Sequence, residues 1–168
     1  MRIFVAVWPP PHVVEQLGSL PRPPVEGVRW TTPDQWHVTL RFLGTVPDPG
    51  VVVAALGAGP LPRAAATMGP RTECLGPAVL SLPVAGLDML ARTVVAATAG
   101  IGKPPENRPF RGHLTLARSR PSAPRRVLRG LAPVEVTATW PVEEVTVVSS
   151  TLGGAGSRYE ILARTPIG

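Results

Sequence analysis

A tetrapeptide of the form His-x-Thr-Leu occurs twice in this chain, and each copy has the pattern of a β-strand. Residues 37–40 (HVTL) lie in the alternating segment 36–43, and residues 113–116 (HLTL) begin the segment 113–117. Side chains two residues apart share a face of a strand, so each copy directs an imidazole and a hydroxyl to one surface and its aliphatic side chains to a core. The copies start 76 positions apart, close to half of the 168 residues, which predicts two similar lobes that each supply one motif to a shared cleft.

Alternation, helical spacing and turn residues predict the elements around the two motifs. Besides the motif segments, strands are predicted at 2–8, 64–75, 78–84, 134–140, 142–149 and 158–164. Helices are predicted at 12–20, 51–56, 87–99 and 122–130. Several strands are separated only by turns, which favours an α+β fold with a largely antiparallel sheet over a doubly wound parallel one. No linker-like segment divides the chain, so residues 1–168 are expected to form a single domain.

Cysteine usage and hydropathy exclude several classes of protein. The chain has one cysteine, Cys74, which excludes an intrachain disulfide and a cysteine-rich zinc module. Its apolar runs are far shorter than the ~18–20 residues of a membrane-spanning helix. Residues 1–11 lack the small-residue cleavage site of a signal peptide. We therefore expect a soluble, cytoplasmic protein without a membrane partner.

Sixteen of the 17 basic residues are arginine, and the formal net charge is +6. Arginine suits phosphate oxygens better than lysine does, although a biased genome composition would explain the same ratio. The distribution is more informative, because residues 107–133 contain seven arginines and no acidic residue, which favours an anionic ligand near the second motif. The seven are Arg108, Arg111, Arg118, Arg120, Arg125, Arg126 and Arg129.

Two histidines that face each other form a chemically reasonable acid–base pair, because an imidazole is easily held neutral or protonated near neutral pH. His37 and His113 would supply the pair, and the remaining histidine, His12, is expected at an exposed helix start. The hydroxyls of Thr39 and Thr115 would bind the oxygens of a phosphate. A metal site built from both motif histidines and Cys74 has no supporting ligand spacing, and no acidic cluster is placed to hold Mg²⁺. We therefore expect phosphoryl chemistry without a metal or another cofactor.

The paired motifs and their flanks resemble the 2H phosphoesterase superfamily, in particular its RNA 2′,3′-cyclic phosphodiesterase branch, which is also named for 2′-5′ RNA ligase activity. The resemblance extends over nearly the whole chain. It is carried by residues 1–6 (MRIFVA), 29–30 (RW), 33–44 (PDQWHVTLRFLG), 108–118 (RPFRGHLTLAR), 150–152 (STL) and 158–164 (RYEILAR).

This resemblance implies a bilobal α+β fold with pseudo-two-fold symmetry, in which two mainly antiparallel sheets line a central groove and the helices lie outside. It also implies hydrolysis of a 2′,3′-cyclic phosphate on an RNA end or a small cyclic nucleotide to a 2′-phosphate. His113 would activate water as the base and His37 would protonate the departing 3′ oxygen, although the sequence also allows the reverse roles. We expect the protein to act as a monomer.

Regular pleating places the other candidate phosphate ligands unequally. Arg41 shares the face of His37, whereas Arg118 falls on the face opposite to Thr115 and would reach the site from the end of the strand. Both are candidate phosphate ligands.

Three aromatic residues have two possible roles each. The resemblance makes Phe42 a candidate for stacking on a nucleobase, although regular pleating places it on the core face. Phe4 and Trp8 have the same ambiguity.

Two departures from the family pattern have different expected effects. Gly112 stands where family members often have proline, and we expect it to loosen the start of the second motif strand without affecting the chemistry. Residues 76–86 lack a tryptophan that family members often carry, which bears on substrate fit. Two alternative functions also remain open from the sequence: an RNA- or nucleotide-binding module with little turnover, and ligation of a cyclic-phosphate end to a 5′-hydroxyl.

Overall fold

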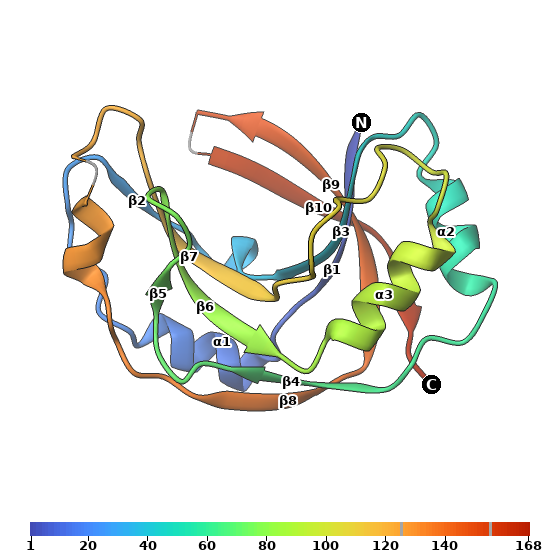
Figure 1. The fold of residues 1–168 in the computed structure, drawn as a ribbon, viewed down its shortest axis with the longest axis horizontal. Coiled ribbons are helices and arrows are strands. Elements are labelled where there is room, and N and C mark those ends of the chain that lie inside the picture. Colours follow the sequence, from blue (N-terminus) through green and yellow to red (C-terminus); the bar gives the residue numbers. More distant parts are fainter. Residues whose placement is uncertain (125, 155) are drawn as a thin grey trace.

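The computed structural model describes residues 1–124, 126–154 and 156–168, and ten of their strands form one curled antiparallel sheet (Figure 1). Its main path runs β10-β9-β1-β3-β7-β6-β4-β8, while β2 pairs with β7 and β5 pairs with β6. One half contains β1 (Arg2–Val7), β3 (Val38–Thr45), β9 (Glu144–Gly153) and β10 (Gly156–Pro166). The other half contains β2 (Val28–Trp30), β4 (Ala64–Met68), β5 (Glu73–Cys74), β6 (Val79–Ala85), β7 (His113–Ser119) and β8 (Ala138–Val142).

The helices are short and lie outside the sheet, with α2 and α3 in contact beside one half (Figure 1). They are α1 (Pro11–Gly18), α2 (Gly50–Gly57) and α3 (Asp88–Ala97), with the 3₁₀ turns η1 (Pro33–Gln35) and η2 (Val127–Leu131). In α3 the buried residues Leu90, Ala91 and Val94 recur at helical spacing and face one large core shared by both halves of the sheet. Within the described residues, no helix combines the length and apolarity needed to cross a membrane.

The two halves of the sheet meet at the two motif strands. β3 and β7 are antiparallel and share one register pair, Val38 opposite Leu114, which are the second residues of the two tetrapeptides. Both side chains are fully buried. The motifs therefore cross at the centre of the sheet, and the predicted α+β fold is confirmed. The two sheets expected from the sequence are two halves of one continuous sheet.

Most predicted elements are present, and three differ in extent from the prediction. The predicted strand 64–75 is divided into β4 and β5, because Gly69 has a φ of +104° and Pro70 provides no N–H for pairing. The predicted helix 122–130 is replaced by the shorter 3₁₀ turn η2, and Arg125 lies outside the described residues. Strand β8 begins only at Ala138, later than expected.

Gly112 lies immediately before the second motif, where the backbones of two segments touch. A Cβ at this position would lie 2.3 Å from the carbonyl oxygen of Val84, and the N–H of Val84 donates to the carbonyl of Gly112 at 2.9 Å. The glycine therefore does not loosen the start of β7 but allows β6 and this segment to approach closely.

This contact predicts that Gly112→Ala lowers the free energy of unfolding by about 2 kcal/mol, because the backbone must move away from Val84. Gly57→Ala is the matched control, since nothing lies within 4 Å of its Cβ position at the end of α2. Urea denaturation of both variants measures the difference. Equal stabilities of the two variants would contradict the close approach.

Candidate active site

A groove of about 260 Å³ opens where the two motif strands meet. It is lined by both motif histidines and both motif threonines, together with side chains from β1, β2, β9 and β10 and from η1. The lining residues are Arg2, Phe4, Arg29, Thr31, Gln35, His37, Thr39, Phe42, His113, Thr115, Arg118, Ser150, Ser157 and Tyr159. The structure thus brings six of the seven sequence-predicted site residues together, and only Arg41 is missing from the lining.

A β-bulge at the fourth residue of each motif changes which face the next residues occupy. Thr39 pairs with Ala6 and Arg41 pairs with Val5, so Leu40 is an extra residue in β3. An extra residue shifts the alternation by one position, which returns Phe42 to the groove face, where its side chain is 37% exposed.

The second motif has the same irregularity at the same place. Thr115 pairs with Ser81 and Ala117 pairs with Leu80, so Leu116 is the extra residue in β7. Arg118 therefore lies on the groove face beside Thr115, and not on the opposite face as regular pleating predicts. Phe42 and Arg118 each come five residues after a motif histidine and occupy equivalent positions in the two halves.

The prediction that Arg41 faces the groove with His37 is wrong, and the bulge at Leu40 is the reason. The Arg41 side chain is 5% exposed and points to the opposite side of the sheet. Its guanidinium donates to three backbone carbonyls and to the hydroxyl of Thr98. Two of these carbonyls, those of Ile101 and Lys103, belong to the loop that leads toward the second motif. Arg41 thus ties this loop to β3.

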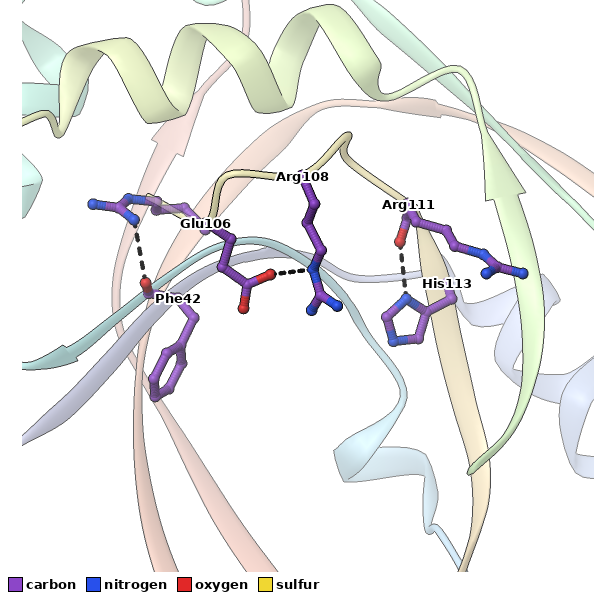
Figure 2. A network of polar contacts seen from close by, with 6 residues as sticks. Phe42, Glu106, Arg108, Arg111 and His113 are labelled. Atoms are coloured by element: carbon purple, nitrogen blue, oxygen red, sulfur yellow. Dashed lines mark hydrogen bonds and ion pairs between the residues drawn. The ribbon is translucent and has the colours of Figure 1, made fainter. Parts of the chain in front are cut away.

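The two motif histidines are oriented in the same way. Nδ1 of His37 lies 2.8 Å from the carbonyl oxygen of Gln35. Nδ1 of His113 lies 2.9 Å from the carbonyl oxygen of Arg111, and Figure 2 shows this second contact. Because a carbonyl only accepts, each Nδ1 carries its proton, and each Nε2 is the nitrogen left for chemistry. In both motifs the carbonyl belongs to the residue two positions before the histidine. Nε2 of His37 also lies 3.1 Å from the hydroxyl of Thr39.

Three aromatic rings surround His37. The ring centroids of Phe4, Trp8 and Tyr159 lie 5.0, 5.1 and 5.0 Å from that of the imidazole. Trp8 is itself held by a hydrogen bond from its indole N–H to the hydroxyl of Thr146 at 2.8 Å. Phe4 and Trp8 therefore form the wall that packs against the histidine, which resolves their ambiguity in the sequence.

These aromatic rings change the pKa of His37. Burial lowers the pKa of His37 from 6.5 to about 4, because the charged imidazolium loses hydration among the rings. The hydrogen bond to Gln35 raises this pKa by less than burial lowers it, and electrostatic interactions with His113 and Arg118 lower it further. His37 is therefore neutral at neutral pH in this structure.

The groove is positively charged. Arg2, Arg29 and Arg118 line it, and no lining residue within the described ranges carries a carboxylate. Among the described arginines of the arginine-rich stretch, Arg118 alone lines the groove. Arg108 pairs with Glu106 (Figure 2), and Arg111 pairs with Glu73. In the described part of the chain, no three His, Cys, Asp or Glu residues are grouped as they would be to hold a metal ion.

Comparison with known proteins agrees with this geometry. Residues 81–159 match the family model described as LigT like Phosphoesterase. The RNA 2′,3′-cyclic phosphodiesterase of Thermus thermophilus is 31% identical over 183 aligned positions, which cover 98% of this chain and 89% of the relative. The chain belongs to the LigT-like 2H phosphoesterase family.

Solved structures have the same fold as this 2H phosphoesterase. A crystal structure of a Thermus thermophilus protein has a TM-score of 0.76 at 30% identity, covering 99% of this chain and 98% of that one. Escherichia coli LigT complexed with 3′-AMP has a TM-score of 0.74 at 26% identity, covering 99% of this chain and 97% of that one.

Several residues of this 2H phosphoesterase groove were not singled out from the sequence. Tyr159 lies in a correctly predicted strand, but the sequence of that strand did not indicate that the ring contacts a histidine. Arg29 and Arg2 come from strands whose pairing partners the sequence does not reveal. A single chain gives no signal that brings these three side chains to the motifs.

The lowered pKa of His37 predicts a pH-dependent stability. The unfolded chain binds a proton at His37 below about pH 6.5 that the folded chain does not bind until about pH 4, so folding weakens as pH falls through this range. The free energy of unfolding of the wild type should fall by about 3 kcal/mol more than that of His37→Asn between about pH 7 and pH 4. Urea denaturation across this range measures the loss. Because His12 is exposed, His12→Asn should follow wild type. Identical pH profiles for wild type and His37→Asn would contradict the assignment.

Proposed function

We propose that this protein hydrolyses the 2′,3′-cyclic phosphate ends of RNA or nucleotides to 2′-phosphates. The observation that carries the proposal is the matched presentation of two imidazoles. Each has its Nδ1 fixed by a backbone carbonyl, which leaves Nε2 for proton transfer, and both line one positively charged groove. Two positioned proton-transfer groups and adjacent cationic and hydroxyl donors suit a phosphodiester displacement. The named activity of the Thermus thermophilus relative supports the same reaction.

The reaction breaks one P–O bond and forms another. Nε2 of one histidine takes a proton from water as its oxygen attacks phosphorus. The bond from phosphorus to the 3′ oxygen breaks, and Nε2 of the second histidine gives its proton to that oxygen. The phosphate stays on the 2′ oxygen. Thr39, Thr115 and Arg118 bind the remaining phosphate oxygens, where donors stabilise the negative charge of the transition state.

The arrangement of the crossed strands orients the substrate. Because β3 and β7 are antiparallel about Val38 and Leu114, Phe42 and His113 lie toward one end of the groove, while His37 and Arg118 lie toward the other. Phe42 offers an exposed apolar ring for a nucleobase, and the guanidinium of Arg2 lies over that ring at 5.5 Å. A base at this end leaves the ribose from C1′, so the C3′ side and its oxygen point toward His37.

This orientation assigns the two proton transfers. His37 lies on the side of the departing 3′ oxygen and acts as the acid, and His113 lies on the side of the attacking water and acts as the base. An acid must be protonated, although burial lowers the pKa of His37 to about 4. A bound phosphate places negative charge beside the imidazole and raises the pKa again, so His37 takes up its proton together with the substrate.

Activity measurements on variants test the pair. His37→Ala and His113→Ala should each lower kcat/KM for 2′,3′-cyclic AMP by at least ~100-fold, because each removes one proton transfer. His12→Ala is the matched control and should keep wild-type activity. Activity should persist in EDTA, because the proton transfers are assigned to imidazoles, and chromatography should identify 2′-AMP as the product.

The same assay on RNA separates the alternatives. If a 5′-hydroxyl replaces water, the displacement forms a 2′-5′ link, which two RNA half-molecules would reveal. A binding module would keep RNA affinity in both histidine variants and give no product. Wild type that turns over neither the cyclic nucleotide nor a cyclic-phosphate RNA end would refute the proposal.

Proton uptake tests the assignment of roles. Binding of 2′-AMP near pH ~7 should take up a substantial fraction of one proton in wild type, since the phosphate raises the pKa of His37. Calorimetry in buffers of different ionisation enthalpy measures this uptake. His37→Asn should lose it and His12→Asn should keep it. Equal uptake in wild type and His37→Asn would mean that His37 does not become the acid.

A further inference from the structure

Two arginines face each other across neighbouring strands at one end of the groove. Arg29 on β2 and Arg118 on β7 are direct register partners, and both line the groove. Like charges directly opposite each other in a sheet destabilise it. Among the described residues, neither guanidinium has an ion pair or a hydrogen bond to offset this repulsion, in contrast to Arg108, Arg111 and Arg164, which pair with glutamates.

The fold makes specific room for the Arg29 side chain. A Cβ at Gly156, which has a φ of +105°, would lie 2.5 Å from Nη1 of Arg29, so the guanidinium rests directly against the backbone at the start of β10. The next residue, Ser157, is held to η1 by a hydrogen bond from the Gln35 amide to its carbonyl at 2.8 Å. Gln35 also supplies the carbonyl that orients His37. Arg29 therefore lies in a structured corner of the groove that is connected to the first motif.

In the proposed orientation of the substrate, this corner lies on the opposite side of the reacting phosphate from Phe42. In a nucleoside 2′,3′-cyclic phosphate, the base leaves the ribose from C1′ and the 5′ oxygen leaves from the C4′ side. With the base at Phe42, the 5′ oxygen points toward the end that carries Arg118. A phosphate attached to that oxygen would meet the two facing guanidiniums.

We propose that Arg29 forms a second phosphate subsite beside Arg118, which binds the phosphate on the 5′ oxygen of the terminal nucleoside. The guanidinium of Arg118 has five N–H donors, so it bridges this phosphate and the reacting one. The orientation of the ligand rests on the proposed function. The ligand is either a terminal 5′-phosphate or the internucleotide phosphate of a longer RNA, and both present the same anionic oxygens to the arginine forks. The anion offsets the repulsion between the two arginines, which would otherwise weaken the pairing of β2 with β7.

Binding of non-cyclic ligands tests the subsite without requiring turnover. The probes are adenosine 3′-phosphate, adenosine 3′,5′-bisphosphate and an adenylate dinucleotide with a 3′-phosphate, measured by calorimetry. In wild type the 5′-phosphate should increase affinity by about tenfold, as expected for hydrogen bonds to a charged group. Arg29→Gln should remove most of this increase, whereas Arg29→Lys should retain part of it. Arg92→Gln, an exposed arginine on α3, is the charge-matched control and should retain all of it.

Salt dependence gives a second readout. Loss of one phosphate contact to a single strand should reduce the slope of log affinity against log salt by about 0.7 for the dinucleotide in Arg29→Gln. Thermal unfolding without ligand should show no destabilisation of this variant, since it removes a like-charge neighbour of Arg118.

The outcomes separate the two proposals and the two phosphate sources. If the bisphosphate and the dinucleotide both bind more tightly than adenosine 3′-phosphate, the subsite accepts an internucleotide phosphate. If only the bisphosphate binds more tightly, the subsite is specific for a terminal 5′-phosphate. No increase in wild type, or an increase that Arg29→Gln retains in full, overturns the subsite. If the increase is present but cyclic substrates are not hydrolysed, the proposed function fails and the subsite stands.

Discussion

The antiparallel contact between β3 and β7 is the constraint on which the rest of this structure depends. It joins the two halves of the sheet through Val38 and Leu114, and it sets the flanking His-x-Thr side chains in opposite directions along one groove. An antiparallel crossing of two similar strands produces a pseudo-symmetric site. The asymmetry that a substrate needs must come from the residues beyond the motifs, and here it comes from an aromatic ring at one end and an arginine at the other.

One extra residue in each motif strand determines which side chains reach the groove. The bulges at Leu40 and Leu116 place Phe42 and Arg118 on the groove face. The bulge at Leu40 also places Arg41 on the opposite face, where it donates a hydrogen bond to the loop before the second motif. Each strand therefore presents a residue five positions after its histidine, where regular alternation would have hidden it. The same chain irregularity supports both the phosphate side and the nucleobase side of the proposed site.

Burial and charge act on the groove in different ways. The rings of Phe4, Trp8 and Tyr159 exclude water from His37 and keep it neutral, while three arginines leave the groove ready for an anion. In the proposed reaction, the reacting phosphate changes the protonation of His37, and in the proposed subsite the phosphate on the 5′ oxygen relieves the repulsion between Arg29 and Arg118. In this proposal, His37 becomes protonated in the same step in which the substrate binds.

The sequence by itself determined the two motif strands and their shared direction toward a cleft through the repeated His-x-Thr-Leu pattern. It also determined the α+β class, through strands separated only by turns, and the family, through the motifs together with their flanks. It could do so because strand alternation is a local property that a few residues specify. The sequence could not determine the faces of Arg41, Phe42 and Arg118, because a bulge is defined only against a partner strand. It also could not determine that Tyr159 encloses His37 or that Arg29 lies opposite Arg118, because these contacts join segments far apart in the chain. Only the tertiary structure decided these positions, through the pairing and curling of the sheet.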